Sequence, residues 1–419
     1  MLIQFSVENY KSIKDRVVIS MEASSDKEHH ENVLPLEKYG VLKSIALFGA
    51  NASGKTNLFS ALTAAILTVR ESSFIQVGQP LRHIVPFKFS EHSKSSPTSF
   101  EFVFIASDGL KYVYGFSALP QKVTSEYLFV YKTAKASSIF ERTNDEFVFT
   151  SVYEKELKPV VSRNTSNKLF LATATAWNCA STREPLLWLM SGINTYNSSN
   201  REEMVYVSGP LLEKDSTQTL KSFTTSLLHK ADINISDFKI TTEEKTHEQF
   251  MQTLPNELKP IFSALPPGPH KKLDVETMHA IEEDGKMKVY SLSLLEESIG
   301  TINLFLLSPV IKRAFETGEV VCIDEFDTSL HPLLVLYIVQ LFNNPLYNKA
   351  NAQLIISSHT TELLDLSIMR RDQIYFIDKN NRTGISDLYS LDEYSERTRT
   401  DIRKAYLLGR YDAIPNIEY

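Results

Sequence analysis

The 419-residue sequence contains little cysteine and no long apolar run. Its two cysteines, Cys179 and Cys322, are isolated, so a disulfide framework or a zinc site is disfavoured and a reducing compartment is favoured. The longest apolar run, around residues 333–342, is too short to span a bilayer, and the amino terminus lacks the pattern of an export signal. We therefore expect a cytoplasmic protein without a membrane partner.

The sequence also lacks a basic stripe and a heptad repeat. Its net charge of −7 and the absence of a basic run do not support sequence-specific reading of DNA, although a basic surface assembled in three dimensions stays open. Without several heptads a long coiled-coil arm is not expected. His247-Glu248 is followed by Met251 where a zinc-protease helix requires histidine, which excludes that class. The 42% hydrophobic content is sufficient for a substantial core in two or three domains.

A glycine-rich phosphate loop is present at residues 49–56, which read GANASGKT. An apolar run at 44–48 predicts a buried strand before it, and the Leu- and Ala-rich segment 56–69 predicts a helix after it. In this order the backbone N–H groups face phosphates, Lys55 reaches the β- and γ-phosphates of ATP, and the Thr56 hydroxyl binds Mg²⁺. The predicted nucleotide contacts here are Gly49, Asn51, Ser53, Gly54, Lys55, Thr56 and Asn57.

A second, acidic motif follows far along the chain. Residues 320–323 form a continuous β-rich apolar run, as expected of a strand buried on both faces, and the run ends in Asp324-Glu325. An acidic pair at a strand end can serve ATP hydrolysis, with Asp324 holding Mg²⁺ and Glu325 polarising the attacking water. The wide separation from the phosphate loop predicts an ATP site split around an inserted segment.

Three further segments specify the kind of ATPase. They are 296–301 (EESIGT), 327–332 (DTSLHP) and 353–359 (QLIISSH), the last an apolar strand with a polar tip. With these motifs the chain resembles the ABC-type ATPases, specifically the SMC/RecF/OLD-like branch, over roughly 1–150 and 285–419. The implied fold class is an α/β ABC-type P-loop ATPase head with an antiparallel β layer and a helical insertion.

The resemblance also implies site residues. Ser298 and Gly300 match the signature motif, Ser329-Leu330-His331 a D-loop, and His359 the switch histidine that joins Glu325 in catalysis. The family works as a head-to-tail ATP sandwich, so the signature residues would contact the nucleotide bound by a second copy of the chain.

The amino-terminal segment 8–13 looks like the short NFxS element of this branch, which implies that Lys11 and Ser12 lie beside the nucleotide. Two departures occur, because Ala52 replaces a glycine and Ile299 stands where Gly or Asp is commoner. No clear Q-loop is present, and both Gln79 and the pair 87–88 (Phe-Lys) stay open as candidates.

The closing segment 406–415 resembles the tail of prokaryotic stand-alone AAA ATPases found in antiphage defence operons, such as PARIS-, Septu-, Rlo- or Abi-like ATPase subunits. This implies a separate effector partner, such as a nuclease or toxin, and DNA or a phage-derived molecule as a possible trigger. From the residues alone, the tail could equally be a helix followed by an aromatic packing segment.

The predicted organisation has three parts. Residues 1–150 form the amino-terminal lobe with the phosphate loop and antiparallel strands, including a hairpin at Asp108-Gly109. Residues 151–285 form a mainly helical insertion with helices near 184–190 and 211–230, and residues 286–419 form the carboxyl-terminal lobe.

Three functions fit these features. The first is an ATP-hydrolysing switch that pairs or oligomerises through composite ATP sites and controls a separate effector in antiphage defence. The alternative is a RecF/SMC-like DNA-repair or recombination ATPase that binds DNA directly, which a longer arm or a basic groove would favour. The third is an OLD-like nuclease, which should carry a TOPRIM domain after the ATPase core.

Overall fold

The computed structural model describes residues 1–36, 39–215, 217–253, 270–394 and 401–415. The chain divides into two compact units. Unit 1 comprises Met1–Ser199, Ala314–Asp327 and Pro332–Tyr419, and unit 2 comprises Asn200–Arg313 and Thr328–His331. Within the described ranges, no helix is long and apolar enough to cross a membrane.

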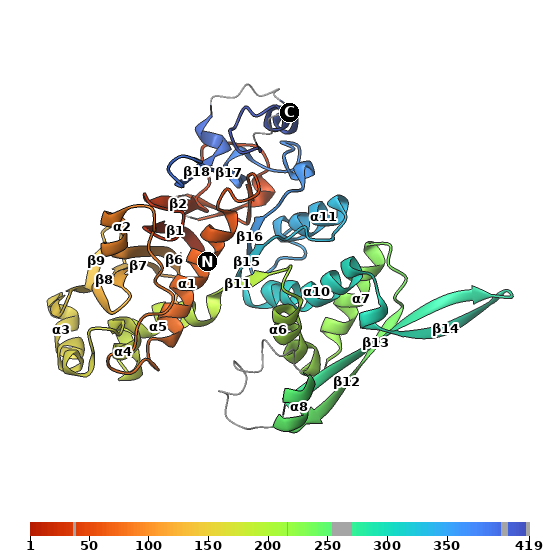
Figure 1. Ribbon diagram of the computed structural model, residues 1–419, viewed down its shortest axis with the longest axis horizontal. Helices are drawn as coiled ribbons and strands as arrows, with labels where there is room; N and C mark the ends of the chain where they lie inside the picture. Colours follow the sequence, from red (N-terminus) through yellow and green to blue (C-terminus); the bar gives the residue numbers. More distant parts are fainter. Residues whose placement is uncertain (37–38, 216, 254–269, 395–400, 416–419) are drawn as a thin grey trace. The chain divides into compact units, whose positions relative to one another are not determined.

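A six-stranded sheet organises unit 1 (Figure 1). Its strand order is β11 (Ile193–Asn197), β15 (Val320–Asp324), β16 (Gln353–Ser357), β5 (Ser44–Phe48), β17 (Ile374–Lys379) and β18 (Ser386–Ser390). The first five strands are parallel, and β18 runs antiparallel to β17. Every residue of β5, β15 and β16 is buried, which explains why these strands read as unbroken apolar runs. Parallel neighbours end at the same edge, so this topology gathers the residues that follow β5, β15 and β16.

A seven-stranded antiparallel sheet forms the second layer of unit 1. Its order is β10 (Glu146–Phe149), β9 (Ser137–Thr143), β8 (Lys122–Tyr131), β7 (Lys111–Leu119), β6 (Thr98–Ile105), β1 (Leu2–Glu8) and β2 (Val17–Ser20). Burial alternates residue by residue along β6, as expected for a strand with one face toward a core. The predicted hairpin at Asp108-Gly109 is confirmed between β6 and β7, with Gly109 at φ 76°.

Helix α1 (Lys55–Glu71) and both sheets share one continuous core. Leu58 and Leu62 of α1 belong to the same buried cluster as Phe102 of the antiparallel sheet and Ile355 of the parallel sheet. The helix is therefore held between the layers, and the position of its amino terminus is fixed by buried contacts.

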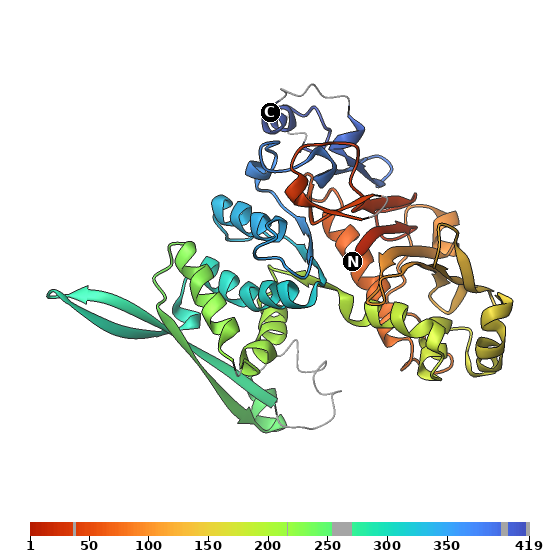
Figure 2. The same ribbon diagram turned by 180° about the vertical axis from the view of Figure 1, so that it is seen from behind.

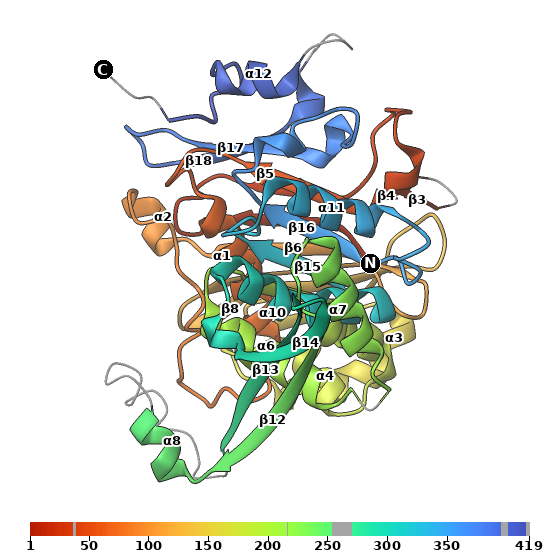
Figure 3. The same ribbon diagram turned by 90° about the vertical axis from the view of Figure 1, so that its right-hand side faces the viewer.

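The remaining helices and short strands of unit 1 connect these layers. They are β3 (Val33–Pro35), β4 (Gly40–Leu42), α2 (Glu91–Ser95), α3 (Ser151–Leu157), α4 (Phe170–Ala176), α5 (Arg183–Leu187), α11 (Pro332–Asn343) and α12 (Ile402–Leu407). Figure 3 shows α12 beside β17 and β18, where the rings of Tyr406 and Tyr411 stack on Phe376. The closing segment is thus a helix plus an aromatic packing segment.

Unit 2 combines helices with a three-stranded antiparallel sheet. Its elements are α6 (Arg201–Glu213), α7 (Thr219–Lys230), β12 (Asp237–Lys245), α8 (His247–Thr253), β13 (His270–Glu283), β14 (Lys286–Ser293) and the greater part of α10 (Ile299–Thr317). The sheet order is β12-β13-β14. Phe238 of β12 packs edge to face on Phe305 of α10 with ring centroids 4.9 Å apart, which joins the sheet to the helices.

The predicted α/β fold class with an antiparallel β layer is confirmed. The helical stretch predicted over 211–230 consists of parts of two helices, because α6 ends at Glu213 and α7 begins at Thr219. Strand β11 and the three-stranded sheet of unit 2 were not predicted from the sequence. The boundary of unit 2 at Asn200 differs from the predicted insertion limits of 151 and 285, which stay a prediction about domains.

Candidate functional site

The phosphate loop, residues 49–56, joins the carboxyl end of β5 to the start of α1. Gly54 precedes the helix at φ 115°, a conformation that side-chain-bearing residues rarely adopt. Lys55 is only 7% exposed, and its ammonium donates to the carbonyls of Gly49 at 2.6 Å and Ala50 at 3.1 Å. Thr56 is exposed at the first turn of the helix. The loop thus presents a cation, a hydroxyl and a helix amino terminus together, which suits a phosphate group.

Two acidic residues lie at the carboxyl end of β15. Asp324 is the last residue of the strand, and Glu325 follows it directly. Asp324 is 4% exposed, and its Oδ1 accepts a hydrogen bond from Ser357 Oγ of β16 at 2.5 Å. The same Ser357 hydroxyl accepts the backbone N–H of Glu325 at 2.8 Å. Ser357 therefore fixes both acids of the predicted catalytic pair, although the sequence analysis gave it no role.

Asp327 positions the segment that carries His359. Its Oδ2 accepts the His359 backbone N–H at 2.7 Å and the Thr360 hydroxyl at 3.0 Å. This carboxylate therefore links the loop after β15 to the loop after β16 and fixes the position of the His359 backbone relative to β15.

The charges of this edge influence one another. Burial lowers the pKa of Lys55, while the carboxylates of Asp324, Asp327 and Glu325 act in the opposite direction. Burial lowers the pKa of His359, and the nearby Lys55 charge lowers it further. The same three carboxylates act in the opposite direction, but the net pKa is lowered. The structure therefore brings Lys55, Asp324, Glu325 and His359 into one electrostatic cluster.

Glu325 adopts a left-handed backbone conformation with φ 52°. A non-glycine residue in this region costs roughly 1–2 kcal/mol and requires support from its surroundings. Besides Ser357, the support comes from Ser198 after β11, whose Oγ donates to the carbonyls of Asp324 at 3.2 Å and of Glu325. Strain at a residue predicted to be catalytic is a feature of many active sites.

Ser12 packs against the phosphate loop. Its Oγ accepts from Asn57 Nδ2 at 2.7 Å and from Ser386 Oγ at 2.9 Å. Ser386 also bonds the Ser53 carbonyl, at 2.7 Å, because antiparallel β18 begins at the edge where the parallel strands end. No motif pointed to Ser386.

Lys11 makes different contacts from Ser12. Its backbone N–H donates to the Val85 carbonyl at 2.9 Å, and its ammonium lies 5.6 Å from the Tyr10 ring centroid. Burial lowers the pKa of Lys11. Its predicted place beside the nucleotide stays a prediction.

The residues predicted to form the signature and the D-loop meet within unit 2. Ser298 Oγ accepts the Thr301 N–H at 3.1 Å at the start of α10. A Cβ on Gly300 would lie 2.5 Å from the carbonyl oxygen of Ser329, which itself has φ 60°. Gly300 is thus needed where the D-loop backbone passes the helix start, and both motifs belong to one compact body.

A family model described as "AAA domain, putative AbiEii toxin, Type IV TA system" matches residues 44–165 and 205–365, more than half of the chain. The chain belongs to this AAA-domain family. The matched ranges of the AAA domain include the phosphate loop, Ser298, Asp324 and His359, whereas Lys11 and Ser12 precede them. P-loop ATPases of this family bind ATP.

Solved structures similar to this AAA domain include two SMC heads and the recombination mediator RecF. An SMC head bound to the C-winged helix domain of ScpA is 13% identical, with 93% of this chain and 97% of that chain covered and a TM-score of 0.40. The SMC head domain from Thermotoga maritima is 12% identical, with 93% and 98% covered and a TM-score of 0.40. The ATP-bound recombination mediator RecF is 16% identical, with 93% and 97% covered and a TM-score of 0.37. A search of curated proteins found no significant match.

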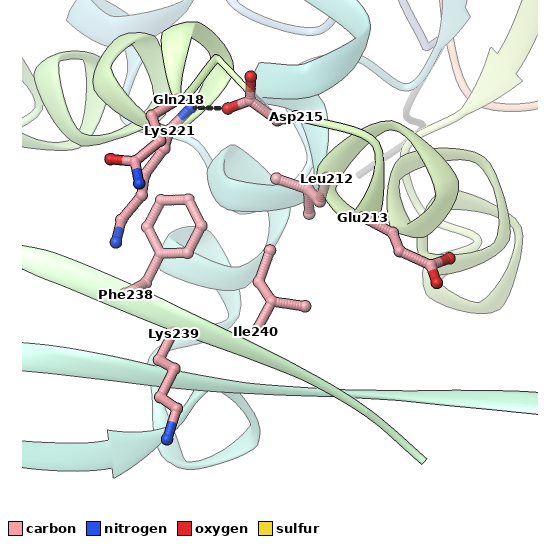
Figure 4. A pocket seen from close by; sticks show the side chains of 8 residues that line it. All are labelled: Leu212, Glu213, Asp215, Gln218, Lys221, Phe238, Lys239 and Ile240. Carbon is pink, nitrogen blue, oxygen red and sulfur yellow. Dashed lines mark hydrogen bonds between the residues drawn. The ribbon is translucent and has the colours of Figure 1, made fainter. Parts of the chain in front are cut away.

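A pocket of about 410 Å³ lies in unit 2 between the α6–α7 connection and β12 (Figure 4). Its lysine, Lys221, pairs with Asp237 at 2.8 Å and lies 5.5 Å from the Phe238 ring centroid. No residue of the AAA-domain motifs lines this pocket, so it is separate from the candidate ATP site.

Proposed function

We propose that this chain is a Mg²⁺-dependent ATPase that works as a molecular switch and controls a separate effector. The observation that carries the proposal is the convergence of Lys55, Asp324, Glu325 and His359 at one edge of the parallel sheet. The four groups come from the ends of three strands, since Lys55 follows β5, Asp324 and Glu325 lie at the end of β15, and His359 follows β16. Ligands bind at such strand ends in open α/β sheets.

The phosphate loop would bind the β- and γ-phosphates through backbone N–H groups and Lys55. Lys55 now donates to two loop carbonyls, and phosphate oxygens would replace them as acceptors. Ser53 Oγ is buried and has no hydrogen-bond partner among the described residues, so the loop holds an unused polar group. Thr56 and Asp324 would hold Mg²⁺, which commonly takes one or two protein ligands besides phosphate and water.

Bound Mg²⁺ supplies charge neutralisation on the phosphates. Glu325 would orient and deprotonate the attacking water, because its carboxylate acts on both Lys55 and His359 and so belongs to the same cluster of charges. His359, kept neutral by its lowered pKa, would hydrogen-bond near the γ-phosphate.

Two copies would share each nucleotide. Ser298 and Gly300 lie at the amino terminus of α10, a favourable place for an anion, and in a compact unit that excludes the phosphate loop. A nucleotide on one copy and the signature of another would then complete a composite site. ATP binding would favour the paired state, and hydrolysis would release it.

The family description names a toxin of a type IV system, and the resemblance to defence ATPases points the same way. We therefore propose that the paired state acts on a separate nuclease or toxin in antiphage defence, triggered by DNA or a phage-derived molecule.

The test uses Glu325→Gln and Lys55→Ala proteins. Glu325→Gln should bind ATP, lose about 10²–10⁴-fold in kcat, and accumulate as pairs with ATP in analytical ultracentrifugation. Lys55→Ala should neither bind ATP nor pair in response to it. Equal turnover by Glu325→Gln and wild type would refute the assigned base.

The effector is sought by affinity purification of Glu325→Gln with ATP from its native host. A stoichiometric nuclease or toxin-like protein, absent with Lys55→Ala, is the expected result. Recovery of the ATPase alone with bound DNA would instead favour the DNA-repair function.

A further inference from the structure

Glu297 anchors the segment before α10 to the sheet of unit 2. Its Oε1 accepts hydrogen bonds from Thr277 Oγ1 at 2.6 Å and from His279 Nε2 at 2.8 Å, both on β13. Thr277 is fully buried, and the side chains of His279 and Glu297 are only 16% and 10% exposed. Hydrogen bonds to a carboxylate are short and strong, so two of them on one oxygen fix the direction of the Glu297 side chain.

The backbone at Glu297 places Ser298 on the opposite side. Glu297 has φ −71° and ψ 166°, an extended conformation, and consecutive side chains of an extended backbone point to opposite sides. The Glu297 side chain therefore faces the sheet, while Ser298 is exposed. Ser298 caps the amino terminus of α10, because its Oγ accepts the Thr301 N–H at 3.1 Å. The Glu297 contact thus determines where this hydroxyl and the helix start are presented.

The sheet that holds Glu297 is itself packed on α10. In the strand register Thr277 lies between Phe238 of β12 and Leu292 of β14. The Phe238 ring, 2% exposed, contacts Phe305 of α10. Figures 1 and 2 show this sheet running past the helices of unit 2. The anchor of Glu297 is therefore the central strand of a sheet that is fixed to the same helix.

The adjacent Glu296 has a different, local role. Its carboxylate accepts the Ser293 N–H at 2.9 Å and completes the capping box of the short turn Leu294–Glu296. Glu296 is exposed, whereas Glu297 reaches a partner 20 residues earlier in the chain. Of these two neighbouring acids, only Glu297 connects the signature segment to the sheet.

We propose that Glu297 is a positioning residue of the composite ATP site, supported by Thr277 and His279. The inference rests on the proposed function, in which Ser298 contacts the nucleotide held by a second copy. A hydroxyl that must meet a phosphate of another copy works best when it is ordered beforehand, because ordering it during association weakens binding. The Glu297 contact supplies this order from within unit 2.

The first test measures ATP turnover and ATP affinity separately. Glu297→Ala should lower kcat about 10–100-fold with a much smaller change in the ATP affinity of the single copy, because the phosphate loop belongs to unit 1. Glu297→Gln keeps an oxygen that accepts both hydrogen bonds and should recover most of the turnover. Thr277→Val removes one donor at nearly the same shape, so a smaller loss in kcat is expected even if Glu297→Ala folds poorly.

Glu283→Ala is the matched control. Glu283 is also a β13 glutamate in an ion pair, with Lys288, and it accepts a hydrogen bond from the Tyr290 hydroxyl at 2.7 Å. Its side chain is 47% exposed, and its described contacts do not include the signature segment. This variant should turn over ATP like the wild type. Equal losses in Glu283→Ala and Glu297→Ala, or no loss in Glu297→Ala, would overturn the proposal.

Mixing experiments determine in which copy Glu297 acts. In a mixture with Lys55→Ala, the intact loop of Glu297→Ala meets an intact signature, so turnover should rise to that of a mixture of Ser298→Arg and Lys55→Ala. A mixture of Glu297→Ala with Ser298→Arg contains no intact signature and should gain nothing. The reverse pattern, with recovery only in the Ser298→Arg mixture, would mean that Glu297 serves its own phosphate loop and would overturn the proposal.

The same mixtures separate this inference from the proposed function. If Ser298→Arg and Lys55→Ala do not complement each other, the shared site is refuted, and the role of Glu297 with it. If they complement each other while Glu297→Ala hydrolyses ATP like the wild type, only the positioning role of Glu297 is refuted.

Discussion

Ser357 illustrates how one buried hydroxyl can fix the geometry of two neighbouring acidic residues, Asp324 and Glu325, which we propose to be a catalytic pair. It donates to Asp324 Oδ1 and accepts the N–H of Glu325, whose backbone is in the left-handed region. Groups of this kind, which hold a ligand or base in place, typically affect activity by 10–100-fold when removed.

We predict that Ser357→Ala lowers the kcat of ATP hydrolysis about 10–100-fold with a much smaller change in ATP affinity. The reason is that Glu325 loses its support while the phosphate loop is untouched. Ser358→Ala is the neighbouring control, because the Ser358 hydroxyl bonds only the Thr360 N–H among the described contacts. Steady-state kinetics and ATP titration check this, and parallel losses in both variants would contradict it.

His359 gives a pH prediction at the same scale. Its folded pKa is lowered, mainly by burial, so the imidazole of the nucleotide-free protein stays neutral below its usual value of 6.5. The unfolded chain then binds a proton more readily, so this residue's contribution to stability is present above pH 6.5 and is lost as pH falls through the folded pKa. NMR titration of the imidazole should give a midpoint below 6.5, and a midpoint above it would refute the environment described.

At the scale of elements, the start of α10 and the D-loop form a single contact. The Ser329 carbonyl oxygen passes so close to Gly300 that a Cβ on residue 300 would lie only 2.5 Å from it. Since the obstacle is backbone, a methyl group cannot be accommodated by a rotamer change.

We predict that Gly300→Ala impairs ATP hydrolysis although alanine favours helix by about 1 kcal/mol. Displacement of the D-loop should leave ATP binding to a single copy intact, because the phosphate loop belongs to unit 1. Ile299→Ala, at an exposed neighbouring position, is the control and should hydrolyse ATP normally. Loss of single-copy ATP binding in Gly300→Ala would show that the motif acts in the same chain.

At the scale of the whole molecule, the composite site predicts complementation. Lys55→Ala lacks a functional phosphate loop and Ser298→Arg a functional signature, so each alone should be inactive. In a mixed pair, the intact loop of one copy meets the intact signature of the other. An equal mixture should recover roughly a quarter of wild-type ATP turnover, given random pairing with one active site per mixed pair. Turnover no higher than that of the separate proteins would exclude a shared site.

The sequence by itself determined the local parts of this protein. The mainly apolar runs at 44–48, 320–323 and 353–356 form buried strands, because a strand covered on both faces needs no polar side. The helix after the phosphate loop was also predictable from local sequence, because Gly54 of the loop directly precedes the first residue of α1, Lys55. These patterns need only neighbouring residues.

Only the tertiary structure decided which distant residues meet. Ser12 and Ser386 are 374 positions apart, and their contact follows from the order of strands in the sheet, which no local pattern encodes. The same holds for Ser198 and Ser357, whose roles depend on β11 and β16 flanking β15. The edge position of β14 is likewise a property of the sheet, because the strand order β12-β13-β14 leaves β14 paired on one side only.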